Sequence, residues 1–145
     1  ISVLGVPDKP GIAYQILGPV AAANLDVDMI VQNIGASGQT DISFTVHRNE
    51  YRKAMDTLER ERGTAFNCRE IKGDDRIAKV SVVGIGMRSH TGLAAMMFKA
   101  LADEGINIQM ISTSEIKIAV VIDEKYLELA VRVLHKAFEL EKAPA

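Results

Sequence analysis

The sequence predicts an α+β protein made of two copies of one β-α-β-β-α-β unit. Three observations support this fold class: an internal repeat, apolar residues that recur alternately at strand and helix spacing, and the order of the resulting segments. The repeat has a constant offset, because Gly11 pairs with Gly92 in the same way that Met29 pairs with Met110. A self-similar chain is typical of repeated structural units.

Composition indicates a globular protein and argues against several function classes. Of 145 residues, 48% are hydrophobic and 25% are charged, and the net charge of −2 gives no reason to expect a nucleic-acid or anionic-membrane partner. Cys68 is the only cysteine, which excludes an intrachain disulfide and a cysteine-cluster metal site and fits a cytoplasmic location. No apolar run approaches the roughly 18 residues of a membrane span. Because the chain starts directly in a strand without an initiator Met, we expect a piece of something longer.

The first copy begins with an apolar strand over residues 1–6 and a rigid turn over residues 7–11 (PDKPG). Pro10 suits the start of a helix, where its missing N–H has no partner in any case. Apolar residues at helical spacing predict a helix over residues 12–23, although Gly18-Pro19 should kink it or make it irregular.

Two strands and a helix follow in this copy, and a further strand comes after them. Apolar and polar side chains alternate over residues 25–34 and again over residues 40–47, as in half-buried strands. Asn49 can cap a helix that runs to about Arg62. Residues 64–71 form the next predicted strand, followed by a turn.

The second copy repeats this order up to its second helix. We expect a strand at 77–83, a loop at 84–89, a helix at 91–104, strands at 106–113 and 115–122, and a helix at 124–140. Gly105 is a good residue for ending the first of these helices, and Asp123 caps the second.

The element order is that of a ferredoxin-like fold, but the second copy lacks a fourth strand. Because a short turn joins residues 64–71 to residues 77–83, the two segments are expected to form a hairpin. Strand 64–71 is therefore predicted to complete the second sheet, which gives domains at residues 1–63 and 64–145. The first sheet then needs a strand from beyond Ala145 or from a partner.

Both copies carry a turn that leads into a helix, and this turn is the candidate ligand site. A helix N-terminus exposes unpaired N–H groups and a partial positive charge, which attract a carboxylate or phosphate. Asp8 in the first turn is able to pair with an ammonium group, and Asp26, Gln32 and Asn107 offer further polar contacts. An anion site beside an acidic residue suits a free amino acid. The alternative is that both turns are only structural, since Gly-Pro-Asp turns often are.

The repeated segments resemble the paired ACT domains of aspartate kinases. The resemblance rests on LGVPDKPG at residues 4–11, DMIVQN at 28–33 and TDISFT at 40–45, and in the second copy on GMRSHTG at 86–92 and MISTSEI at 110–116. It covers nearly the whole chain and implies the regulatory region, or β subunit, of an aspartate kinase. The kinase that phosphorylates L-aspartate with ATP would be the catalytic domain, which this chain lacks. In the family the second ACT domain is inserted in the first.

The resemblance also implies a function and its residues. The family binds lysine, threonine or both at interfaces between ACT domains, for feedback inhibition of amino-acid biosynthesis. The first effector site would include Asp8, Gly11, Ile12, Ala13, Leu25, Asp26, Val27 and Gln32, closed by Asn107 and Ile108. The second would include Met87, Ser89, His90, Gly92, Leu93, Ala94, Ser114 and Glu115. We expect a homodimer through these domains, a kinase catalytic domain or subunit as partner, and no cofactor.

Other functions have less support in the sequence. No catalytic constellation appears, and His47 and His135 lack a second ligand at metal spacing. Cys68 has no evident base beside it and is interpreted as a plain strand residue. The strands lack the aromatic pairs of RNA-recognition motifs. A pure assembly module that holds subunits together and binds no ligand is the main alternative.

Overall fold

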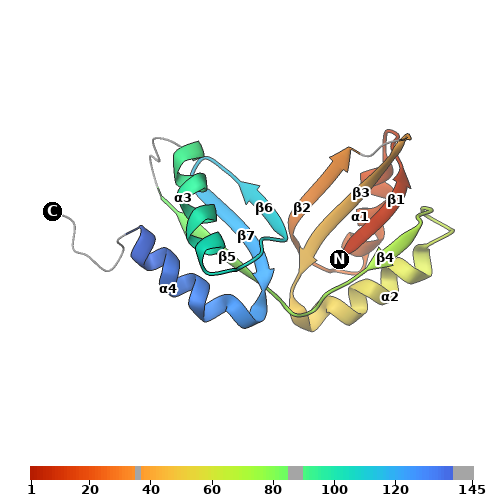
Figure 1. Cartoon of the computed structure of the whole chain (residues 1–145). Helices are drawn as coiled ribbons and strands as arrows, with labels where there is room; N and C mark the ends of the chain where they lie inside the picture. The colour runs from red at the N-terminus through yellow and green to blue at the C-terminus, as the bar shows by residue number, and fades with distance from the viewer. Residues whose placement is uncertain (35–36, 85–89, 139–145) are drawn as a thin grey trace. The chain divides into compact units, whose positions relative to one another are not determined.

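The structure is a computed structural model that describes residues 1–34, 37–84 and 90–138. The chain forms two compact units, Ile1–Asp75 and Arg76–Ala145, each with one antiparallel sheet and two longer helices (Figure 1). The predicted α+β class with two ferredoxin-like units is confirmed.

The first unit contains a complete β-α-β-β-α-β set. Its elements are β1 (Ser2–Pro7), α1 (Ile12–Ala22), β2 (Val27–Ile34), β3 (Gln39–Val46), the 3₁₀ turn η1 (Arg48–Glu50), α2 (Tyr51–Glu61) and β4 (Glu70–Lys72). The strands lie in the order β2-β3-β1-β4. Helix α1 continues through Pro19, so the irregular turn predicted there is not found.

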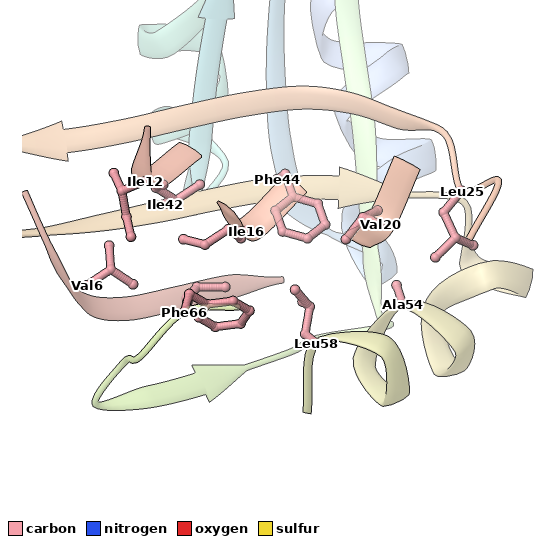
Figure 2. Packing of buried hydrophobic residues seen from close by; sticks show 11 residues of the cluster. Val6, Ile12, Ile16, Val20, Leu25, Ile42, Phe44, Ala54, Leu58 and Phe66 are labelled. Atoms are coloured by element: carbon pink, nitrogen blue, oxygen red, sulfur yellow. The ribbon is translucent and has the colours of Figure 1, made fainter. Parts of the chain in front are cut away.

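The core of the first unit lies between its helices and its sheet. Ile16 and Val20 of α1 and Leu58 of α2 meet Phe44 of β3 there, and all four are fully buried (Figure 2). Apolar residues at i, i+4 on each helix and at alternate positions on the strand place these side chains on the facing surfaces.

The predicted role of strand 64–71 is wrong. Only Glu70–Lys72 is a strand, and it pairs with β1 through Val3 and Ile71 rather than with the second sheet. Phe66, in the preceding segment, is buried in the first core. Its side chain and that of Ile71 bury apolar surface against the first unit, which outweighs the local preference for a hairpin. Among the described residues the first sheet therefore already has four strands, and the first unit is continuous in sequence rather than interrupted by the second. The two units divide after Asp75, whereas the sequence predicted a boundary after residue 63.

In the second unit, residues 76–84 and 90–138 form three strands and two longer helices. They are β5 (Ile77–Val83), α3 (His90–Asp103), β6 (Met110–Thr113), β7 (Lys117–Asp123), the 3₁₀ turn η2 (Glu124–Tyr126) and α4 (Leu127–Ala137). The strand order β5-β7-β6 places β5 at an edge. Asp123 Oδ1 accepts a hydrogen bond of 3.0 Å from the N–H of Lys125, which confirms the predicted cap. Ile118, Val120 and Ile122 of β7 pack with Met97 and Leu101 of α3 in the second core.

Candidate functional site

The turn between β1 and α1 opens the helix through its backbone. Gly11 is the N-cap residue with φ of 88°, and no side chain caps the helix. A side chain at this φ would be strained, although a Cβ would meet no atom within 4 Å. Gly11 is thus required for the bend rather than for close approach of a neighbour. Asp8 and Gly11 are exposed, whereas Ile12 is buried and anchors the start of α1.

Two hydrogen bonds outside the turn hold β1 and the start of the turn in place. The N–H of Asp8 donates to the carbonyl of Gly38 at 2.9 Å, which ties the turn to the hairpin between β2 and β3. The N–H of Gly5 donates to Asp41 Oδ1 at 2.8 Å, at the irregularity in β1 where Gly5 has φ of 67°. Asp41 entered the sequence interpretation only as part of a family motif. Its role depends on a contact between strands, which the linear sequence does not display.

The predicted residues of the first site fall at two ends of the sheet. Pro7 pairs with Gln39 at the start of β3, so Asp8 and Gly11 lie at that end. Gln32 belongs to the half of β2 that runs toward the same end, since Ile34 pairs with Thr40. In contrast, Leu25, Asp26 and Val27 lie at the other end, where Val27 pairs with Val46. The 11 residues of α1, about 16 Å of helix, separate the two groups within one unit.

The same residues differ in exposure. Asp26 and Gln32 are exposed, Ala13 and Val27 are half-buried, and Leu25 is buried in the first core. Asn107 and Ile108 lie in the second unit, in the segment that leads into β6; Asn107 is exposed and Ile108 packs on the second core.

The second predicted site is partly described. Met87 and Ser89 lie outside the described residues, and of His90 only the backbone, at the start of α3, is described. Gly92, Ser114 and Glu115 are exposed; Leu93 and Ala94 pack on the second core. The N–H of Gly84 donates to the carbonyl of Ile116 at 2.8 Å, so the turn with Ser114 and Glu115 meets the end of β5. In the first unit, the hydrogen bond between Asp8 and Gly38 likewise joins the end of the first strand to a hairpin turn.

Within residues 1–34, 37–84 and 90–138, no three His, Cys, Asp or Glu side chains are arranged to hold a metal ion. In those ranges no helix combines the length and apolar character needed to cross a bilayer. Cys68 lies in an irregular segment rather than in the predicted strand. Burial raises the pKa of its thiol, which makes it a poor nucleophile at neutral pH.

Comparison with known proteins establishes the family. A family profile described as "ACT domain" matches residues 1–61 and 80–138. The chain belongs to the ACT domain family. The two matched segments correspond to the two units of the fold, so this ACT chain carries the domain in tandem.

Its relatives are aspartate kinases. The chain is 61% identical over 145 residues to the aspartate kinase of Pseudomonas putida and 49% identical over 142 residues to the aspartokinase of Helicobacter pylori. These matches cover 100% and 98% of the chain but 35% and 34% of the relatives, so the chain spans about a third of their length.

Solved structures of similar fold also belong to aspartate kinases. A chain in a crystal structure of aspartokinase alpha and beta subunits is 61% identical, with a TM-score of 0.88 over 95% of this chain and 90% of that one. The ligand-free regulatory subunit of aspartate kinase from Thermus thermophilus is 38% identical, with a TM-score of 0.84 over 94% and 89%. The tandem ACT chain thus corresponds to the regulatory portion of aspartate kinases.

Proposed function

We propose that this tandem ACT chain is the effector-binding part of an aspartate kinase, and that lysine, threonine or both are its effectors. The whole protein would phosphorylate L-aspartate with ATP in the cytoplasm, through a catalytic domain or subunit that this chain does not contain. The observation that carries the proposal is the exposed turn in which Gly11 opens α1 without a side-chain cap, three residues after Asp8.

The chemistry of that turn suits an amino acid. Helix N-terminal N–H groups and the helix dipole stabilise a carboxylate, and the Asp8 carboxylate can accept hydrogen bonds from an ammonium group. A free amino acid carries both charges a short distance apart. A ligand with only one of them would lose half of these contacts.

Assembly explains how the two groups of predicted residues would meet. Strand β2 is at an edge of its sheet, and antiparallel pairing of this edge with another ACT unit would bring the start of one strand beside the end of the other. Leu25, Asp26 and Val27 of one unit would then face the turn of the next. Asn107 and Ile108 have equivalent positions before β6, which favours a site shared between a first and a second ACT unit of a homodimer.

Inhibition would follow from differential binding. A ligand shifts an equilibrium between two arrangements only by its preference for one of them. A charged amino acid held between two units binds only when those units are paired, and the paired arrangement would hold the kinase inactive.

Isothermal titration calorimetry tests the proposal. Titration of the chain with lysine and with threonine should release or absorb heat for at least one of them, whereas the D-enantiomers should give a much weaker signal. No heat with either L-amino acid, in a chain whose dimer is intact, would favour the alternative, an assembly module that binds no ligand.

A further inference from the structure

Strand β2 carries a β-bulge close to its start. Its register with β3 shifts between Val27 and Ile30, so that two residues, Asp28 and Met29, lie opposite the single residue Thr45. A bulge bends its strand and changes the direction of the neighbouring side chains, and bulges are frequent beside functional sites. This one adjoins the predicted effector residues at the start of β2.

The bulge decides which way the start of β2 faces. Val27 lies opposite Val46, and both pack on the first core. Ile30 lies opposite Phe44, which is buried in the same core. In a regular strand, residues three positions apart point to opposite faces of the sheet. The extra residue of the bulge therefore brings Val27 to the core face and leaves Asp26 beside it exposed.

A side chain of β3 anchors the bulge. The N–H of Met29 donates to Thr45 Oγ1 at 3.0 Å, in a buried hydrogen bond. A bulge takes one residue out of the ladder of backbone hydrogen bonds, and a buried N–H without an acceptor is costly. Because Thr45 is only 8% exposed, its hydroxyl serves the backbone rather than a ligand in solution.

Thr45 belongs to a row of polar side chains on β3. Asp41, Ser43 and Thr45 alternate with buried core residues, so they share the face of the sheet that points away from the core. Asp41 accepts the N–H of Gly5 at the irregularity in β1. Strand β3 thus fixes an irregularity in each of its neighbours, one beside the turn that opens α1 and one at the start of β2. These are the two ends of the sheet at which the predicted site residues lie.

The second unit forms the counterpart of this bulge without a hydroxyl group. The repeat matches Met29 with Met110 and, through the pairs in the two sheets, Thr45 with Val121. Met110 pairs with Val121, and the N–H of Gln109 donates to the carbonyl of the same residue at 2.8 Å. Of the two matched positions, only that in the first unit has a side-chain anchor, and this unit contains most of the first predicted effector site.

We infer that Thr45 is a positioning residue of the effector site. Its hydroxyl holds the bulge of β2, and the bulge presents Asp26 and Val27 to an amino acid bound between two units. Thr45 itself lies behind the site and does not touch the effector. The inference rests on the proposed function, because it concerns the affinity of that same site.

Loss of the hydroxyl should weaken binding by making the binding conformation rarer. The apparent Kd of a ligand rises as the conformation that it binds becomes less populated. Without the Thr45 hydroxyl, the bulge would hold a buried N–H of Met29 that has no acceptor. The usual cost of such a group corresponds to about a five- to hundredfold change in an equilibrium, and we expect Kd to rise by about tenfold.

Calorimetry of the whole chain with L-lysine and L-threonine tests this role. Thr45→Val keeps the shape of the side chain and should raise the Kd of the amino acid that binds by about tenfold. Thr45→Ser keeps the hydroxyl and should bind as the wild type does. Thr45→Cys should give an intermediate Kd, because sulfur is a weak acceptor.

Thr57→Val is the matched control. Thr57 is 2% exposed, and its hydroxyl donates to the carbonyl of Lys53 at 2.8 Å within α2. Its replacement should lower Tm without changing Kd, which separates a loss of stability from a loss of positioning.

Hydrogen exchange of the Met29 amide gives a second measurement that needs no ligand. Exchange should be faster in Thr45→Val than in the wild type, Thr45→Ser or Thr57→Val, because in Thr45→Val alone this amide loses its acceptor. An unchanged exchange rate in Thr45→Val would overturn the inference.

The binding results separate this inference from the proposed function. Equal Kd values for Thr45→Val and the wild type would overturn the role of Thr45 and leave the proposed function intact. A loss of affinity in Thr45→Ser or Thr57→Val as large as in Thr45→Val would overturn it as well. No binding of either amino acid by the wild-type chain would contradict the proposed function and, with it, this role.

Discussion

At the scale of single residues, Asp8 is the side chain on which effector recognition depends. It is exposed, and its own N–H is fixed by the carbonyl of Gly38. Replacing it by Ala should weaken binding of lysine or threonine by about 1.5–3 kcal/mol, the typical contribution of a hydrogen bond to a charged group. Calorimetry measures this change, and Asp56→Ala, at an exposed acid on α2, is the matched control. Unchanged affinity in the Asp8 variant would remove this residue from the site.

Asp41 supports β1 from inside the first unit. Its carboxylate accepts the N–H of Gly5, whose left-handed conformation and closeness to Arg69 Cβ leave no room for a side chain. Asp41→Ala should lower the free energy of unfolding by about 1–3 kcal/mol, because the partly buried N–H of Gly5 loses its acceptor. Asp41→Asn keeps an acceptor oxygen and should cost clearly less. Urea denaturation compares the two variants, and equal losses would mean that the hydrogen bond is not the cause.

The thiol of Cys68 gives a prediction about pH. Burial is the main reason that its pKa lies above the ordinary value, with a smaller opposing effect of Arg62. A raised pKa means less thiolate at any given pH, so alkylation by iodoacetamide should be slower than for a free cysteine and should accelerate only at higher pH. The rate profile of the folded chain is compared with that of the chain in guanidinium. Identical profiles would show that folding does not perturb this thiol.

At the scale of elements, most helices and strands could be predicted from local patterns, whereas strand pairing could not. The alternating pattern of residues 40–47 correctly predicts β3, and the helical spacing of Ala54 and Leu58 correctly predicts α2. In both elements the apolar residues of the pattern are the ones that the fold buries. The segment 64–71 lies next to β5 in sequence, and a short turn favours a hairpin. Its true partner is decided by the burial of Phe66 and Ile71 against β1 and α2, which only the folded first unit offers.

The candidate site, too, could be predicted from local sequence only in part. The turn from Asp8 to Gly11 could be predicted because turn residues and a helix start are local features. The separation of Asp26 from Asp8 by the length of α1 could not, because it depends on strand direction and register.

The placement of β4 can be tested through Phe66. Phe66→Ala should destabilise the first unit by about 3–5 kcal/mol, the usual cost of removing a buried aromatic side chain. Amide exchange should then accelerate in β1 and α2 and remain slow in the second unit. Leu101→Ala in α3 is the complementary control and should affect the second core instead. Faster exchange in β5 rather than β1 after the Phe66 change would restore the hairpin interpretation.

At the scale of the whole molecule, the two repeated units are similar, but their described sheets differ in the number of strands. The first is closed by β4, whereas the described part of the second leaves β5 at an open edge beside an apolar groove. Each unit of about 70 residues has a small core, so contacts with further chain are expected to contribute to its stability. We assign the β2 and β6 edges to the effector-linked assembly proposed above.

The central claim is that the turn at the start of α1 binds an end-product amino acid. Backbone amide NMR of the chain during titration with lysine and with threonine tests it most directly. At least one amino acid should shift the Gly11, Ile12 and Ala13 resonances in a saturable way, with the apparent Kd that calorimetry gives. Saturable binding that leaves these three amides unmoved, or no binding of either amino acid, would contradict it.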